Sequence, residues 1–156
     1  MDERKKNADG GVEVKAVVQR VSRATLRVNG ETVSKIGAGL CVYLGVERGD
    51  LSAQADALAK KIAKLRIFED DAGKLNRSAL DCGLEVLAIS NFTLCADCAH
   101  GNRPSFIGAE APEPANALYV RFCEELSGLG IRVSRGVFGA DMKIEQVNDG
   151  PVTIVL

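Results

Sequence analysis

The pair Asn29-Gly30 constrains the fold of this chain more than any other short feature of its sequence. Asn-Gly is the strongest short signal for a tight β-hairpin, because both residues tolerate a positive φ. The pair separates residues 24–28 from residues 32–36, which are therefore expected to be paired strands. Residues 14–21 and the strongly apolar residues 40–46 predict two more strands, the second buried on both faces.

Only two later segments have the spacing of an amphipathic helix. In residues 51–65 apolar side chains recur every three or four positions, and Asp50 or Ser52 is expected to cap this helix. Residues 115–126 predict the second helix, which ends near Gly128 or Gly130. Two helices are too few to cover both faces of a doubly wound sheet, so we expect an α/β fold with an antiparallel or mixed sheet. The remaining expected strands are residues 84–89, 131–137, 143–147 and 152–156.

Length and composition predict one cytoplasmic domain over residues 14–156, preceded by a disordered tail over residues 1–13. The tail has no apolar stretch typical of a secretory signal, and no apolar run approaches the ~20 residues of a membrane helix. Five cysteines in such a chain are expected to be reduced thiols. A net charge of −1 argues against binding along a long nucleic-acid duplex, but it allows recognition of a short end.

Two short polar segments are candidates for chemistry. The segment Ser90-Asn91-Phe92-Thr93-Leu94 follows an expected buried strand, where backbone N–H groups could stabilise an oxyanion. The pattern alone favours an ordinary strand end, whose Ser and Thr side chains bond local carbonyls. The segment Asn148-Asp149-Gly150-Pro151 has the composition of a turn. Its Gly-Pro bond could also be cis, which would direct two neighbouring carbonyls the same way as a rigid gauge. The single histidine, His100, lies in a Gly-flanked loop and is expected to be solvated.

Five blocks of sequence, in this order along the chain, resemble those of the D-aminoacyl-tRNA deacylases. The resemblance implies a sheet curved toward a barrel with two main helices packed on it, and a homodimer. It also implies hydrolysis of the ester in D-aminoacyl-tRNA without a cofactor or metal, refusal of L-aminoacyl-tRNA, and in some members removal of glycine from tRNA for alanine. The blocks are residues 14–21, 90–94, 101–106, 136–142 and 148–153.

The same resemblance assigns roles to particular residues. The catalytic segment comprises Ser90, Asn91, Phe92 and Thr93, with the Phe92 and Thr93 N–H groups expected to stabilise the oxyanion. Either the Thr93 hydroxyl is the nucleophile, or the ribose 2′-hydroxyl of the RNA activates water. With no histidine or carboxylate in residues 90–94 to act as base, the sequence favours the second scheme.

Substrate recognition is assigned to residues farther along the chain. Gly150 and Pro151 are expected to enter the partner subunit's pocket and to exclude an L side chain. Phe138 and Met142 are expected to line the pocket for the terminal adenine or the amino acid, and Arg20 is expected to brace the Gly150-Pro151 turn.

Two departures from the family pattern leave alternatives open. Asn91 replaces the usual glutamine, and its amide reaches about 1.5 Å less far; a non-catalytic module that binds aminoacyl-tRNA ends therefore stays an alternative. Cys95 and Cys98, with Cys82 and His100 nearby in sequence, have a spacing that would allow zinc, so a small zinc-bearing interaction protein is a third possibility.

Overall fold

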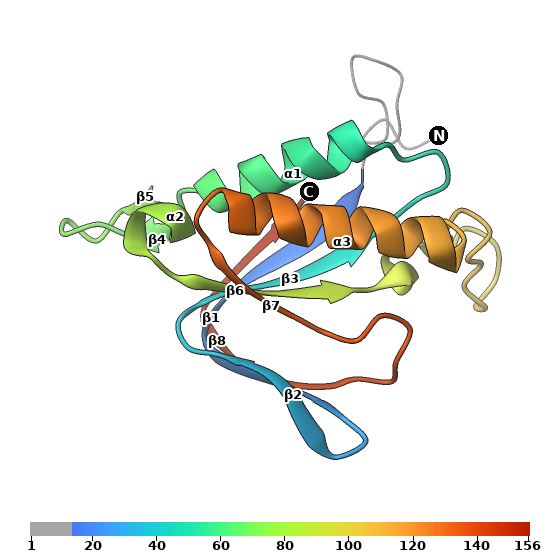
Figure 1. Ribbon diagram of the computed structural model, residues 1–156, viewed down its shortest axis with the longest axis horizontal. Helices are drawn as coiled ribbons and strands as arrows, with labels where there is room; N and C mark the ends of the chain where they lie inside the picture. Colours follow the sequence, from blue (N-terminus) through green and yellow to red (C-terminus); the bar gives the residue numbers. More distant parts are fainter. Residues whose placement is uncertain (1–13) are drawn as a thin grey trace.

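The computed structural model describes residues 14–156 and arranges them as a strongly curved sheet with two long helices side by side on one face (Figure 1). The tail expected over residues 1–13 lies outside the described residues. No helix in the described part of the chain is long and apolar enough to cross a membrane. The elements are β1 (Lys15–Val28), β2 (Glu31–Ile36), β3 (Gly39–Gly45), α1 (Ser52–Lys64), β4 (Phe68–Glu69), β5 (Leu75–Arg77), α2 (Ala79–Cys82), β6 (Glu85–Ser90), η2 (Phe92–Cys95), α3 (Pro112–Gly128), β7 (Arg132–Arg135) and β8 (Lys143–Val155).

The predicted hairpin is confirmed: β1 and β2 are antiparallel and meet at Asn29 and Gly30, whose φ angles are 51° and 78°. The strands expected over residues 14–21 and 24–28 are, however, one continuous strand. Strand β1 stays continuous because β8 pairs with both of its halves, with register shifts on either side of Val21. On its other side the first half of β1 pairs with β3 and the second half with β2.

The sheet is mixed and nearly closed. Its strand order is β2-β1-β3-β6-β7, and β8 pairs with β1 outside this path. Strands β3, β6 and β7 are parallel to one another, whereas the other pairings are antiparallel. The hydroxyl of Ser34 on β2 donates a hydrogen bond to the carbonyl oxygen of Arg135, so the two ends of the path approach each other. This confirms the expected mixed sheet curved toward a barrel.

Helices α1 and α3 cover one face of the sheet and are joined by a bidentate contact between Arg121 and Asp56, with both N···O distances 2.8 Å. The expected side-chain cap of α1 is wrong. Its first turn is stabilised by Gln54, whose side chain accepts from the Leu51 N–H, and Asp50 instead accepts from the Glu47 N–H. Helix α3 begins earlier than expected, at Pro112, because proline is favourable in the first turn, where its missing N–H costs no helical bond.

Apolar side chains are buried on both faces of the sheet. One cluster lies between the sheet and the helices and includes Leu44, Ile62 and Phe122; the other lies within the curve of the sheet and includes Leu26 and Leu87. Burying each such side chain contributes about 1.5–3 kcal/mol. The curved sheet therefore packs against a hydrophobic core on each of its two faces.

Three further short elements, and the continuity of a second long strand, were not expected from the sequence. The hairpin β4–β5 and the single turn α2 lie where no element was predicted. The strands expected over residues 143–147 and 152–156 form the single strand β8, so the segment predicted as a turn lies within a strand. Pairing with β1 on both sides of Asn148 explains this continuity.

Candidate active site

A cavity of about 500 Å³ opens beside the end of β6. Its wall is formed by the end of β6 and the start of η2, the segment that leads into α3, and the loop between β7 and β8. Most of the side chains are apolar, and Glu110 is the one ionisable residue among them. The lining residues are Val46, Ser90, Asn91, Phe92, Phe106, Ala109, Glu110, Pro112, Ala115, Phe138, Gly139, Ala140 and Met142.

The catalytic segment expected after the strand of residues 84–89 is a strand end followed by a 3₁₀ turn. Strand β6 ends at Ser90, and the Asn91 N–H donates to the Leu44 carbonyl on β3 at 2.8 Å. This turn packs closely on Gly45 at the end of β3, where an added Cβ would lie 2.9 Å from the Leu94 Cβ. A glycine there is what lets the turn approach the sheet.

Phe92 and Thr93 occupy the exposed start of this turn. Among residues 14–156, neither of their backbone N–H groups donates a hydrogen bond, as is usual at the start of a helical turn. Phe92 is 57% exposed, and its ring packs edge-to-face against that of Phe106, with centroids 5.1 Å apart. The Thr93 hydroxyl donates to the Asn91 amide oxygen at 2.5 Å, an acceptor too weakly basic to take its proton.

Phe138 and Met142 also line the cavity, so the structure brings them together with Ser90, Asn91 and Phe92, whereas Thr93 is not among the lining residues. The Phe138 ring packs on that of Tyr119, with centroids 6.4 Å apart. Tyr119 is fixed in turn because its hydroxyl donates to the Ala88 carbonyl on β6 at 2.7 Å, and burial raises its pKa.

Sequence reasoning missed the third wall, which the segment before α3 supplies. Phe106 lies within a block that carried the family resemblance, so the block was a usable signal for it. Ala109 and Glu110 gave no such signal, because their position depends on a backbone hydrogen bond from the Glu110 N–H to the Val46 carbonyl at 2.9 Å.

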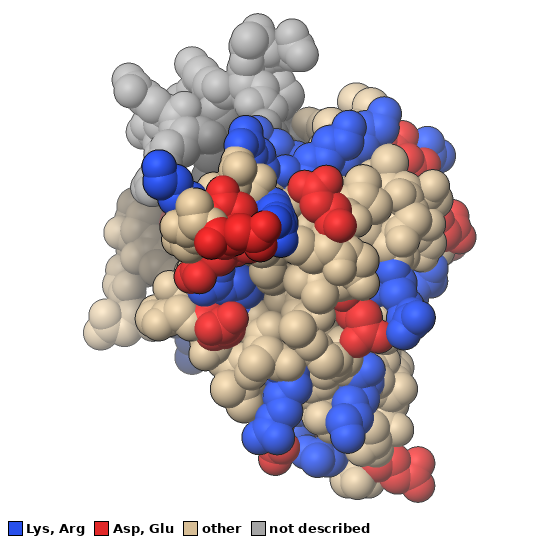
Figure 2. Space-filling model, turned by 90° about the vertical axis from the view of Figure 1, so that its left-hand side faces the viewer, with Lys and Arg blue, Asp and Glu red and all other residues tan. Residues whose placement is uncertain are grey.

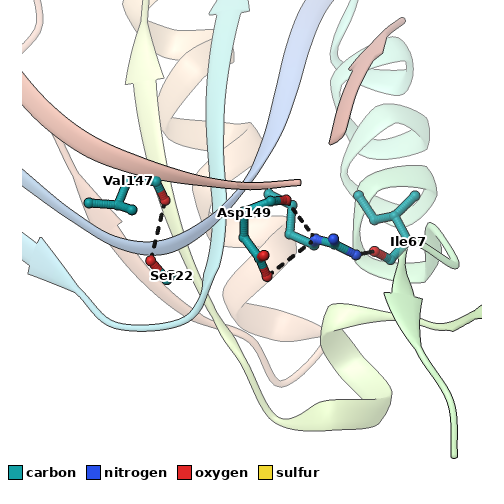
Figure 3. Close-up of polar contacts among 5 residues, drawn as sticks. Ser22, Ile67, Val147 and Asp149 are labelled. Atoms are coloured by element: carbon teal, nitrogen blue, oxygen red, sulfur yellow. Dashed lines mark hydrogen bonds and ion pairs between the residues drawn. The ribbon is translucent and has the colours of Figure 1, made fainter. Parts of the chain in front are cut away.

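Gly150 and Pro151 do not line this cavity in their own chain. Their peptide bond is cis, and both residues are exposed. Arg20 lies beside them, only 7% exposed: its Nε donates to the Asp149 carbonyl at 3.0 Å and its Nη1 to the Ile67 carbonyl at 2.8 Å. In Figure 3 the dashed lines from Asp149 and Ile67 converge on this guanidinium, and the Asp149 carboxylate adds an ion pair at 3.6 Å.

The cysteines considered as zinc ligands are not gathered around one point. Cys95 is buried and its thiol donates to the Val46 carbonyl at 3.5 Å, whereas Cys82 and Cys98 are exposed. No group of three or more His, Cys, Asp or Glu side chains placed to hold a metal ion occurs in the described part of the chain. The arrangement therefore gives the zinc alternative no support.

Most of the chain is similar in sequence to known proteins. Over residues 17–156 the sequence matches the family described as D-Tyr-tRNA(Tyr) deacylase. A D-aminoacyl-tRNA deacylase of Paracoccus denitrificans (strain Pd 1222) is 55% identical over 141 residues, which cover 90% of this chain and 95% of that protein. One of Deinococcus radiodurans is 55% identical over 143 residues, which cover 92% of this chain and 99% of that protein.

Solved structures share the fold. One described as c-Myc DNA Unwinding Element Binding Protein has a TM-score of 0.84 and 44% identity, and the match covers 91% of this chain and 97% of that one. A probable eukaryotic D-amino acid tRNA deacylase has a TM-score of 0.80 over 92% of this chain and 98% of that one, and at 19% identity it is similar in fold alone. The family match and the relatives at 55% identity confirm that the chain belongs to the D-aminoacyl-tRNA deacylase family, and thereby to the hydrolases that act on aminoacyl-tRNA.

Proposed function

We propose that this protein hydrolyses the ester of D-aminoacyl-tRNA in the cavity beside β6, releasing the D-amino acid and free tRNA. The observation that carries the proposal is the pair of N–H groups of Phe92 and Thr93, neither of which donates a hydrogen bond within residues 14–156. Phe92 lines the cavity and Thr93 follows it in the chain, at the exposed start of the turn. Two adjacent N–H groups that are free to donate are suited to stabilising a developing oxyanion at the mouth of this cavity.

In this scheme water attacks the ester carbonyl, the carbonyl oxygen becomes the oxyanion, and the ribose oxygen leaves with a proton. The 2′-hydroxyl of the terminal ribose activates the water. Support comes from Thr93, whose hydroxyl donates to the Asn91 amide oxygen and has no hydrogen bond to a general base among residues 14–156. Ser90 and Asn91 then position the turn, and Phe138 and Met142 contact the adenine or the amino acid.

Chiral selection is proposed to depend on a homodimer. Gly150 and Pro151 of one subunit enter the other subunit's cavity, and their carbonyls fill the space that an L side chain would need. Both residues are exposed and neither lines the cavity of its own chain, which supports this arrangement. Glycine has no side chain to meet these carbonyls, so glycine mischarged on tRNA for alanine is a further substrate. We expect the dimer to work in the cytoplasm.

A two-variant mixing experiment tests the shared site. The substitution Thr93→Pro would remove one oxyanion donor, the Thr93 N–H, from the catalytic segment. Gly150→Ala would disturb the other half, because Gly150 has a φ of 132° and an added Cβ would lie 2.8 Å from the Val152 nitrogen. Thr93→Pro alone should lose release of labelled D-tyrosine from D-Tyr-tRNA, and Gly150→Ala alone should lose it or begin to accept L-Tyr-tRNA. Co-expressed subunits should regain D-selective release at roughly a quarter of wild-type activity, from one intact site in each mixed dimer.

The controls separate the possible failures. Each variant must retain a cooperative unfolding transition and the dimer mass. Absence of recovery in mixed dimers of confirmed composition would place all catalytic residues in one subunit. Binding of D-Tyr-tRNA by the wild-type protein without release of D-tyrosine would instead support the alternative of a non-catalytic module that binds aminoacyl-tRNA ends.

A further inference from the structure

A second hollow, of about 650 Å³, lies on the outer face of the sheet where β1, β2 and β8 run side by side. We call it the basic groove. Figure 2 shows Lys and Arg side chains gathered at the lower end of the face that it presents, the end where Figure 1 places the β1–β2 hairpin. The lining residues are Arg23, Thr25, Arg27, Lys35, Ile144, Glu145, Gln146 and Val147.

The charge of the basic groove is positive although that of the chain is not. Three cations line it against the single carboxylate of Glu145, whereas the whole chain has a net charge of −1. Glu145 forms an ion pair with Arg27 at 3.2 Å. Among residues 14–156 neither Arg23 nor Lys35 forms an ion pair, so two positive charges in the groove are not neutralised by neighbouring side chains.

The pairing of the strands fixes the spacing of these cations. Thr25 is opposite Lys35 on β2 and opposite Glu145 on β8, and Arg23 is opposite Val147. Arg23 and Arg27 are four residues apart on the same face of β1, which corresponds to about 13 Å. A row of that length fits a stretch of polyanion better than one isolated small anion.

The basic groove also lies close to both parts of the proposed active site. Met142 of the cavity, immediately before β8, precedes Ile144 of the groove by two residues, or about 7 Å. At the other end Val147 precedes Gly150 by three residues, or about 10 Å. A nucleic acid whose 3′ end enters either cavity of the proposed dimer would therefore have its next nucleotides near such a groove.

We propose that the basic groove binds the sugar-phosphate backbone of the substrate tRNA, just before its aminoacylated end. This inference rests on the proposed function. Phosphate contacts of this kind position the RNA without reading its sequence, which suits an enzyme that meets many tRNAs. They also reconcile a nearly neutral protein with a polyanionic substrate, because the contact is confined to one short stretch.

The test compares two substrates that share the ester but differ in phosphates. The double variant Arg23→Gln/Lys35→Gln should lower kcat/KM for D-Tyr-tRNA about tenfold at 50 mM salt, through KM, and lower the slope of log KM against log salt by about two. Hydrolysis of 3′-O-D-tyrosyl-adenosine, which has no phosphate, should not change. Glu145→Gln should act in the opposite direction and lower KM for the tRNA.

The matched control is Lys60→Gln/Lys64→Gln, which removes two exposed cations from α1, far from β8 in sequence. An equal loss of salt dependence in this control would overturn the groove proposal, as would equal losses on both substrates. A change in dimer mass in the Arg23/Lys35 variant would assign the face to subunit contact and would also overturn it. If the wild-type protein hydrolyses neither substrate, the proposed function itself fails.

Discussion

The Nε of Arg20 donates a 3.0 Å hydrogen bond to the carbonyl oxygen of Asp149, the residue immediately before Gly150. The same guanidinium donates from Nη1 to Ile67, so one buried side chain on β1 joins β8 to the segment after α1. Because a guanidinium carries its donors in a rigid fork, it can hold two carbonyls that face it from different directions. Arg20 is therefore placed to fix the position of the Gly150 segment relative to the rest of the subunit.

Replacing Arg20 by lysine should affect both stability and activity. A lysine keeps the charge but has one compact head group, so we expect it to lose at least one of the two carbonyl contacts, at a cost of about 1–3 kcal/mol in the free energy of unfolding. Deacylation should fall more steeply than stability alone explains, because the Gly150 segment is displaced. Urea unfolding and kcat/KM on D-Tyr-tRNA measure the two effects.

Ser22 provides the matched comparison, since it also lies on β1 and also bonds a β8 carbonyl, that of Val147, at 3.5 Å (Figure 3). Ser22 is exposed and its contact is long, so Ser22→Ala should change the free energy of unfolding by less than about 0.5 kcal/mol. If Arg20→Lys proved as mild as Ser22→Ala in both measurements, Arg20 would not position the segment.

Thr93 distinguishes the two catalytic schemes. Thr93→Val keeps the shape of the side chain and the backbone N–H but removes the hydroxyl that bonds Asn91. If the 2′-hydroxyl activates water, this variant should retain kcat within about tenfold, equivalent to 1.4 kcal/mol. Substrate ending in 2′-deoxyadenosine should be nearly inert with wild type and variant alike. Loss of chemistry in Thr93→Val, with normal tRNA binding and unfolding, would restore the threonine nucleophile.

Much of the fold was predictable because its signals are local. The Asn29-Gly30 turn and the helical spacing of α1 depend on neighbouring residues, and both were found from sequence. The continuity of β1 and β8 was not, because each is held together by pairing with the other across more than 100 residues of chain. Likewise Asp50 suits a helix cap by type, yet its carboxylate is committed to the Glu47 N–H.

The residues of the candidate site also divide into those predictable from local motifs and those that depend on the folded chain. Phe92, Phe138 and Met142 were identified through motifs, and all three line the cavity. The wall around Glu110 was missed, because only the folded chain brings that segment against Val46. The relation of Gly150 and Pro151 to a cavity depends on a second subunit, so neither one sequence nor one folded chain can establish it.

Asn91 offers a test of the departure from the family pattern. Its side chain is half-buried, lines the cavity and accepts the Thr93 hydroxyl. Asn91→Gln adds one methylene and moves the amide about 1.5 Å farther; the cavity has room for it, so kcat should stay unchanged or rise. Single-turnover rates on D-Tyr-tRNA would show this. A loss above tenfold, about 1.4 kcal/mol, would mean that the pocket is adapted to asparagine.

A cluster of charges behind the cavity wall predicts a pH dependence of stability. Asp50 is buried, and its pKa is raised to about 6, mainly by burial and to a smaller extent by the nearby carboxylates of Glu47 and Glu110. The hydrogen bond from the Glu47 N–H and the charge of Lys15 act in the opposite direction and lower this pKa. In the unfolded chain the same carboxyl titrates near its ordinary value of about 4. Between these two values the folded protein holds a proton that the unfolded chain has lost.

The sign of the effect follows from that difference. As pH rises from about 4 to 6, Asp50 must ionise in a buried site, so the free energy of unfolding of the wild-type protein should fall over this range. Asp50→Asn keeps an oxygen that can accept from the Glu47 N–H but does not ionise, so it should be more stable than wild type by about 1–3 kcal/mol at pH 8, with the difference vanishing below about pH 4. Urea unfolding from pH 4 to 8 measures this difference.

The comparison is Asp56→Asn, at the exposed contact with Arg121. Because this contact lowers the pKa of Asp56, removing the Asp56 carboxylate should lower the free energy of unfolding at pH 8. A stability difference between wild type and Asp50→Asn that does not change with pH would show that the Asp50 carboxylate is already solvated in the folded protein.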